Sequence, residues 1–158
     1  MRHRRAKRII STVAIVLAFV TAGCHATRAP AREPQTPEAR IDLETIAGRV
    51  WILETWRAGE PAAPDPQVSL RYAAGSLSGR AGCNRYTAPI ERRPGLGSIA
   101  IGAIAATRMM CPDPTMTTES RFLETLTRAK ALELRDTKLN LVYTTPNGTD
   151  AALTFRPE

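Results

Sequence analysis

Two cysteines frame the most constraining segment of this chain, which runs from Gly82 to Pro112. It opens with the residues Gly-Cys-Asn-Arg-Tyr-Thr (82–87) and closes with Thr-Arg-Met-Met-Cys-Pro (107–112). A turn-rich part (89–97) and an apolar run (98–106) lie between them. A bond between Cys83 and Cys111 would close a loop of about 29 residues and limit how the chain can fold. Whether the bond forms depends on the compartment, which the N-terminus indicates.

The first 23 residues have the composition of a secretory signal peptide. Five basic residues lie within positions 2–8, and the segment 9–20 is apolar apart from Ser11 and Thr12. The residues Val-Thr-Ala-Gly-Cys (20–24) resemble a bacterial lipobox, so we expect Cys24 to be acylated and to begin the mature protein. Ordinary cleavage and an uncleaved anchor are the alternatives, although the apolar run is shorter than the roughly 20 residues that span a bilayer.

Residues 24–40 are expected to form a tether. Pro30, Pro34 and Pro37 lie among Ala, Arg, Glu and Thr without any helical or strand period, a composition that does not bury a core. His25 follows Cys24 in place of the aspartate that retains such lipoproteins in the inner membrane. We therefore expect an exported protein, held by its acyl groups at the periplasmic face of the outer membrane.

The net charge of +7 is mostly a property of the leader. Without the five basic residues at the N-terminus, 17 basic and 15 acidic residues remain. No basic stripe with interleaved aromatic residues is present in the remainder, so we expect no nucleic acid partner.

Residues 41–158 are predicted to form one α+β domain. Gly and Pro separate about seven short alternating segments from one amphipathic helix, in which Asp113 is expected to cap the N-terminus and Pro114 to occupy the first position. The strands are predicted at 50–56, 68–72, 77–81, 99–103, 132–135, 138–144 and 151–155. The pattern indicates an antiparallel sheet curled around, or capped by, the helix.

Cys83 and Cys111 are the two cysteines left once Cys24 is acylated, so they form the one possible intramolecular disulfide in an oxidising compartment. The alternatives are a redox-active pair and a metal site. Redox catalysis favours a C-x-x-C spacing, which is absent, and a zinc site needs further ligands. Because the mature chain has one histidine, His25, beside the lipid, we predict no metal and no cofactor.

Several of these residues also resemble a known family. The Trp-Ile-Leu at 51–53, the Gly-Cys-Asn-Arg-Tyr block, Thr-Arg-Met-x-Cys at 107–111, the Glu119 to Leu126 helix and the late Leu139-x-Leu141 strand are similar to the META domain of HslJ-like proteins. The resemblance covers about residues 48–157, and Ala88 departs from it where the family often has glycine. It implies a partly open β-barrel packed by a helix, and envelope or secreted proteins linked to heat shock, antibiotic tolerance or virulence. It implies no known enzyme activity.

Polar residues beside the cysteines are the candidate recognition patch: Asn84, Arg85, Tyr86 and Arg108. The alternative is structural, with Asn84 bonding the turn backbone and Arg108 packing on Tyr86 or a tryptophan. Without a histidine in the folded part we expect no catalytic triad and no enzyme. Glu119 and Glu124 are expected to be solvated, as are Arg92 and Arg93, which could otherwise touch anionic lipid headgroups.

The sequence therefore favours a monomeric, lipid-anchored interaction module that contacts an envelope protein and supports stress or antibiotic tolerance. The alternative is a carrier of a small apolar ligand or lipid, held between sheet and helix by Trp51, Trp56, Met109 and Met110. These four side chains are otherwise expected in the core.

Overall fold

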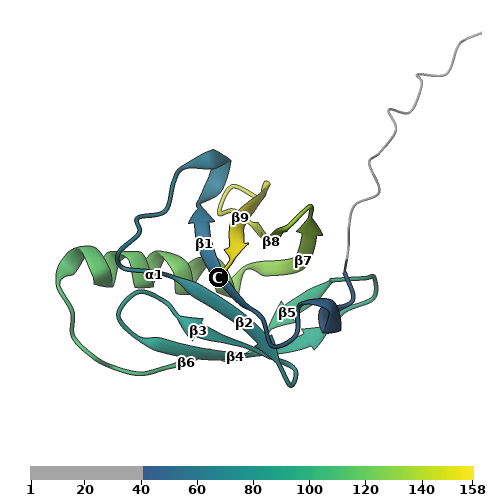
Figure 1. Cartoon of the computed structure of the whole chain (residues 1–158), viewed down its shortest axis with the longest axis horizontal. Coiled ribbons are helices and arrows are strands. Elements are labelled where there is room, and N and C mark those ends of the chain that lie inside the picture. The colour runs from purple at the N-terminus through teal and green to yellow at the C-terminus, as the bar shows by residue number, and fades with distance from the viewer. Residues whose placement is uncertain (1–40) are drawn as a thin grey trace, which may run out of the picture. The chain divides into compact units, whose positions relative to one another are not determined.

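The computed structural model describes residues 41–158, so the predicted signal peptide, Cys24 and the tether lie outside the described residues. This part of the chain contains nine strands, one α-helix and two 3-10 helices (Figure 1). In chain order they are η1 (Leu43–Ile46), β1 (Val50–Thr55), η2 (Arg57–Gly59), β2 (Ser69–Ala73), β3 (Ser76–Arg80), β4 (Arg85–Arg92), β5 (Ile99–Ile101), β6 (Ala105–Ala106), α1 (Asp113–Thr127), β7 (Ala129–Arg135), β8 (Lys138–Thr144) and β9 (Asp150–Pro157).

The strands form one antiparallel sheet that curls on itself. Their order is β5-β4-β3-β2-β1-β9-β8-β7, and β6 pairs with β4 off this path. The two ends of the sheet approach each other, since the backbone N–H of Leu132 in β7 donates to the carbonyl of Gly97 before β5 at 2.9 Å. Ser98 also forms a bridge with Ala131. This short contact leaves the barrel partly open, which confirms the predicted fold class.

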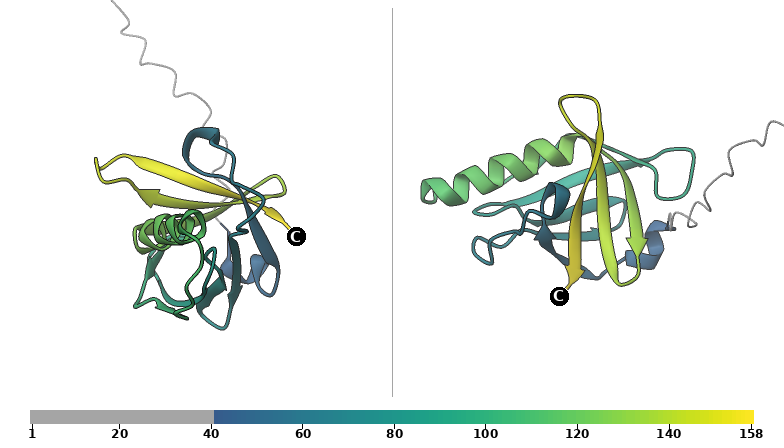
Figure 2. Two further views of the ribbon diagram at one scale, coloured as in Figure 1. Left: turned by 90° about the vertical axis from the view of Figure 1, so that its left-hand side faces the viewer. Right: turned by 90° about the horizontal axis from the view of Figure 1, so that it is seen from above.

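Helix α1 lies inside the curl of the sheet. Seen end-on in Figure 2, it runs between the β7–β9 strands on one side and the β2–β4 strands on the other. Phe122 and Leu126, four positions apart on one face, are fully buried. They meet fully buried side chains from the sheet: Trp51, Leu70, Leu77, Leu132, Leu139, Leu141, Leu153 and Phe155. Each such side chain contributes about 1.5–3 kcal/mol through its burial, so the core fixes the helix against the sheet.

The number of strands is larger than predicted because β4 and β6 were missed. The segment 89–97 was expected to be turn-rich, yet β4 continues through Pro89 to Arg92. Proline lacks a backbone N–H, but the Pro89 carbonyl accepts a hydrogen bond from Gly102 at 2.8 Å, which maintains pairing on that side. The two residues of β6 are too few to show a period.

The predicted turns lie where expected, whereas the helix cap does not. Ala74 and Gly75 both have positive φ, 47° and 74°, as a tight hairpin between β2 and β3 requires. At the helix, Pro112 occupies the N-cap position and no side chain caps the first turn. The prediction that Asp113 caps the helix is therefore wrong, because Asp113 is already the first helical residue.

Candidate functional site

A disulfide joins Cys83 to Cys111, the two cysteines at the ends of the segment 82–112. The two Cα atoms are 6.0 Å apart. Cys83 is buried just before β4, and Cys111 lies just before α1. The predicted pairing is present, and it holds the start of α1 against the start of β4.

Asn84 lies next to this disulfide and is 2% exposed. Its side-chain amide donates to Glu119 Oε1 at 2.9 Å and to the Met109 carbonyl at 3.1 Å. Its Oδ1 accepts from Thr107 Oγ1 at 2.8 Å and from the Met109 N–H at 2.7 Å. The side-chain amide thus makes four hydrogen bonds to three residues, which uses both of its donor hydrogens and both lone pairs of its oxygen. We call Asn84, Thr107, Met109 and Glu119 the Asn84 clasp.

Glu119 is the member of the clasp that was expected to lie in solvent. Its Oε2 accepts from the Asn84 backbone N–H at 2.6 Å, and the residue is 7% exposed. The expectation that it is solvated is wrong, because α1 turns this side chain inward. Glu124, five positions on, is exposed and pairs with Arg128 at 2.6 Å, as a surface carboxylate would.

Tyr86 is also a structural residue. Its hydroxyl donates to the Ser69 carbonyl at 3.1 Å, and its ring packs edge-on against Phe122 at 5.3 Å. Burial raises the pKa of Tyr86 above its ordinary value of 10.0. Of the predicted patch, Asn84 and Tyr86 therefore face inward, and Arg85 and Arg108 are exposed.

Arg85 instead joins two other arginines around a hollow of about 400 Å³ on the outer face of β2, β3 and β4. Arg71 lies on β2, Arg80 on β3 and Arg85 on β4. The remaining polar side chains around it are those of Gln67, Ser69, Ser78 and Thr87. We call this surface the arginine hollow. Period-2 alternation places these side chains outward, while Leu70, Tyr72, Leu77 and Tyr86 point into the core.

The arginines of the hollow have no ion-pair partner among the described residues. Arg80 and Arg85 are directly opposite each other in the β3–β4 register, an arrangement that like charges make unfavourable. Within residues 41–158 no carboxylate lies within 4.0 Å of Arg71, Arg80 or Arg85. By contrast, five other arginines have a partner at that distance: Arg92, Arg93, Arg121, Arg128 and Arg135.

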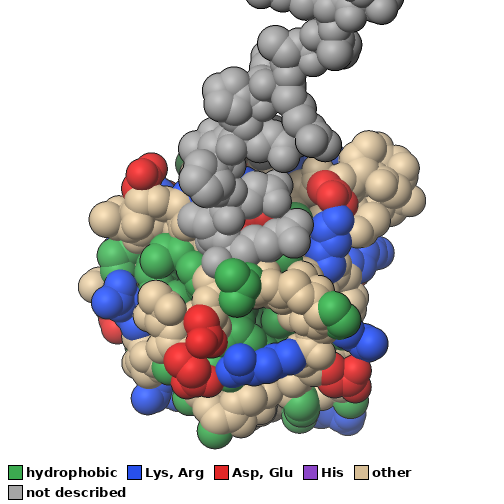
Figure 3. All heavy atoms as spheres, turned by 90° about the vertical axis from the view of Figure 1, so that its right-hand side faces the viewer, with side chains coloured by type: hydrophobic (Ala, Val, Ile, Leu, Met, Phe, Trp, Pro, Cys, Tyr) green, Lys and Arg blue, Asp and Glu red, His purple; other side chains and the backbone are tan. Residues whose placement is uncertain are grey.

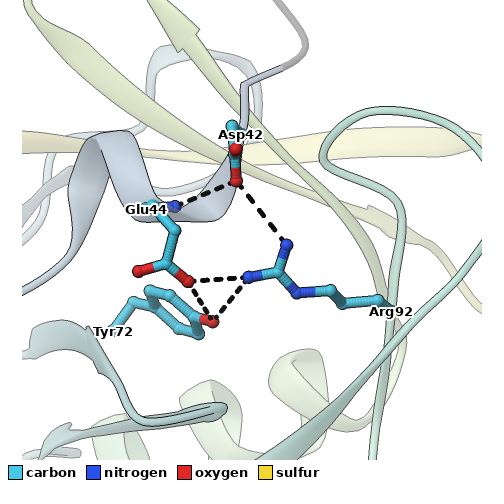
Figure 4. A network of polar contacts seen from close by, with 4 residues as sticks. All are labelled: Asp42, Glu44, Tyr72 and Arg92. Carbon is cyan, nitrogen blue, oxygen red and sulfur yellow. Dashed lines mark hydrogen bonds and ion pairs between the residues drawn. The ribbon is translucent and has the colours of Figure 1, made fainter.

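A second hollow, of about 460 Å³, lies where the described chain begins, but its charges are paired. Arg92 contacts Glu44 at 2.8 Å, Asp42 at 3.6 Å and the Tyr72 hydroxyl at 3.1 Å (Figure 4). The hydrogen bond to Tyr72 raises the pKa of Arg92, and the negative charges of Asp42 and Glu44 raise it further. Figure 3 shows acidic and basic side chains intermixed on this face. These contacts hold η1 against β2 and β4.

A third polar cluster lies against the middle of helix α1. Arg121 makes two hydrogen bonds to the Glu60 carboxylate, both 2.6 Å, and lies 4.2 Å over the Trp56 ring. The hydrogen bond to Arg121 lowers the pKa of Glu60 below its ordinary value. Since Trp56 is buried beneath this pair, the cluster fastens the loop after β1 to α1.

The four residues proposed for an apolar ligand divide into two groups. Trp51 and Trp56 belong to the core, whereas Met109 and Met110 are 52% and 92% exposed. The methionines therefore do not face the tryptophans. Their exposure follows from the clasp, which uses the Met109 backbone and turns its side chain outward.

The described residues contain no group of three His, Cys, Asp or Glu placed to hold a metal. Within the same residues, no helix has the length and apolar character needed to cross a membrane.

The curled antiparallel sheet with a single helix inside it defines an α+β fold, and the arginine hollow lies on its outer surface. A family model for the META domain matches residues 44–157, and the chain belongs to this family. No curated protein matches the chain.

Two solved structures share the fold. An NMR structure of a protein from Burkholderia xenovorans is 25% identical, with a TM-score of 0.56 over 73% of this chain and 86% of that one. A second NMR structure is 23% identical, with a TM-score of 0.56 over 73% of this chain and 94% of that one.

Proposed function

We propose that this META domain protein is a lipid-anchored interaction module of the cell envelope that acts by binding and not by catalysis. The observation that carries the proposal is the arginine hollow, which three exposed arginines border and where none of them pairs with a carboxylate of residues 41–158. Holding like charges together costs stability, so a protein gains from the arrangement when a partner neutralises them.

The envelope location comes from the N-terminal sequence. An acylated Cys24 would hold the chain in the membrane, and the tether would let the domain move near its surface. The proposed location is the periplasmic face of the outer membrane. The role in envelope stress or antibiotic tolerance follows from the resemblance to HslJ-like proteins.

The rigid link between the helix and the sheet supports recognition by a preformed surface. The disulfide and the Asn84 clasp immobilise the turn from which β4 starts, and Arg85 is the first residue of that strand. A guanidinium on a fixed strand loses less conformational freedom on binding than one on a loop.

One observation fits the alternative function, a carrier of a small apolar ligand or lipid, provided that the ligand has a hydrogen-bond acceptor. The indole N–H of Trp51 is buried, and it has no acceptor in the part of the chain that the structure describes. Against a carrier stands the packing of the interior, which Trp51, Phe122 and Phe155 fill with fully buried side chains. A ligand would have to displace them, so the interaction module is the better-supported function.

The proposal is tested by complementation of a strain that lacks the gene, with sensitivity to envelope stress and antibiotics as the readout. We expect the intact chain to restore tolerance, and Arg71→Gln/Arg80→Gln/Arg85→Gln to fail at equal protein abundance. Arg93→Gln is the matched control, because Arg93 is exposed but pairs with Glu91 at 2.9 Å. Unchanged sensitivity of the deletion strain would refute the stress role.

The anchor has its own test, intact mass on protein extracted from membranes. The expected mass is that of residues 24–158 with acyl groups and with no free thiol before reduction. An unacylated mass would refute the anchor without affecting the arginine hollow.

A further inference from the structure

The chemistry of the arginine hollow specifies the charge of its partner. Three guanidinium groups, from Arg71, Arg80 and Arg85, border one hollow of about 400 Å³, a size that suits a small polar group. A guanidinium offers paired N–H donors in a planar fork that matches phosphate and carboxylate oxygens. The hollow therefore has the positive charge and the hydrogen-bond donors that an anion requires.

The donors around the hollow suit a phosphate. The three arginines come from three adjacent strands, and each offers a fork of N–H donors that suits two phosphate oxygens. Hydroxyl groups of Ser78 and Thr87, which pair across β3 and β4, add further donors to the same hollow.

A nucleotide base would find no stacking partner in this hollow. Tyr86 is the one aromatic residue that borders it, and its ring is packed against Phe122 in the core. Stacking on an exposed ring contributes much of the affinity for single-stranded nucleic acid. The recognised element is thus the phosphate itself.

We propose that the arginine hollow binds the phosphate of anionic lipid headgroups in the membrane to which the chain is tethered. This inference rests on the proposed function, since it needs the anchor at Cys24. The tether of residues 24–40 spans at most about 3.3–3.6 Å per residue, or roughly 55–60 Å when extended. A domain of this size has a radius of gyration of about 13–14 Å, so the tether lets any face of it reach the bilayer.

Attachment at two points would fix the orientation of the domain. The acyl groups supply the first contact, and they raise the effective concentration of headgroups near the arginine hollow. Weak binding of single phosphates is then sufficient to hold the β2–β4 face against the membrane. The contact should weaken with added salt, because exposed charges are screened.

The test measures which arginines the membrane protects. The acylated mature protein, residues 24–158, is reconstituted in phosphatidylcholine vesicles, with or without phosphatidylglycerol, and labelled with phenylglyoxal for site-resolved mass spectrometry. A third arm adds inorganic pyrophosphate to the neutral vesicles. Arg108 is the internal control, because it is exposed and lies outside the arginine hollow.

We expect phosphatidylglycerol to reduce labelling of Arg71, Arg80 and Arg85 at least fivefold and to leave Arg108 unchanged. Pyrophosphate should protect the same three residues. Protection by pyrophosphate but not by the lipid would overturn the membrane as the source of phosphate. Equal protection of all four arginines would show diffuse attraction and no site, and absence of protection in both arms would overturn the proposal entirely.

Two variants complete the test. Arg80→Lys/Arg85→Lys keeps both charges but removes the forks, and we expect it to lose most of the protection of Arg71. Arg80→Gln/Arg85→Gln should raise the thermal midpoint in the absence of anions, since it removes the like-charge pair, while abolishing protection. If the lipid does not protect the three arginines but complementation needs them, the lipid proposal is refuted and the proposed function stands with another partner. If the lipid protects the three arginines but complementation does not need them, the proposed function alone is refuted.

Discussion

Glu119 accepts two hydrogen bonds from Asn84, one from the backbone N–H at 2.6 Å and one from the side-chain amide at 2.9 Å. These bonds join the middle of α1 to the residue before β4, across 35 positions of sequence. Because both residues are buried, water does not replace either partner easily. The Asn84–Glu119 pair is therefore a specific, buried polar contact between α1 and the start of β4.

Glu119→Gln should destabilise the domain by about 2–3 kcal/mol, because one terminal atom becomes an NH₂ facing a donor of Asn84. Urea unfolding followed by tryptophan fluorescence gives the free energy of unfolding. The control is Glu124→Gln on the same helix, for which we expect a change within about 0.5 kcal/mol. Equal effects of both substitutions would contradict the structural role of the clasp.

Removal of the disulfide should lower the free energy of unfolding by about 3.6 kcal/mol, the chain-entropy value for a loop of roughly 29 residues. The measurement is urea unfolding of the protein with and without reductant. Cys83→Ser/Cys111→Ser should be insensitive to reductant, which shows that the reductant acts on this bond. We expect the reduced protein to remain folded at low urea, because the Asn84 clasp still holds α1 to β4. Complete unfolding on reduction would show that the clasp alone is insufficient.

Much of the fold could be predicted because its signals are local. Alternation in 138–144 identified β8 with its bounds, since Leu139, Leu141 and Tyr143 face the core. The disulfide followed from a count of cysteines. The β4 strand was missed because Pro89 signals a turn locally, while the pairing that keeps it in the sheet comes from residues distant in sequence.

The candidate site was predicted less well, and the reason is again distance in sequence. Asn84, Arg85 and Tyr86 are adjacent in the chain, but a strand directs adjacent side chains to opposite faces. Arg85 therefore groups with Arg71 and Arg80, which only the sheet register brings beside it. Glu119 did carry a signal, since it lies three and seven positions before Phe122 and Leu126 on the buried face of α1, but its partner on another element could not be predicted.

Gly79→Ala should destabilise the protein by more than about 3 kcal/mol, since overpacking against backbone cannot be relieved by a rotamer change. A Cβ at this position would lie 2.1 Å from the Ser69 carbonyl oxygen, which also accepts the Tyr86 hydroxyl. Gly75→Ala is the control, because nothing lies within 4 Å of its Cβ and the cost is backbone strain at φ 74°. That strain is worth roughly 1–2 kcal/mol. Thermal unfolding should rank the two variants in this order, and the reverse order would contradict the close approach of β2 and β3.

Tyr86 should make the stability of the domain fall in alkaline solution. Burial raises the pKa of Tyr86 in the folded state above 10.0, while the unfolded chain has the ordinary value. Below about pH 10 the phenol is protonated in both states, so its contribution to stability is fully present. As the pH rises further the unfolded state loses the proton first, and the contribution declines by up to about 1.4 kcal/mol per pH unit.

Tyr86→Phe separates this effect from the titration of all other groups. At pH 8 the variant should be less stable than the parent protein by about 1 kcal/mol, since it lacks the hydrogen bond to the Ser69 carbonyl. Between pH 10 and 11.5 that difference should shrink and then reverse, because phenylalanine has no proton to lose. The measurement is the free energy of unfolding in urea for both proteins across pH 8–11.5. A difference that stays constant with pH would show that the Tyr86 phenol ionises as readily in the folded domain as in the unfolded chain.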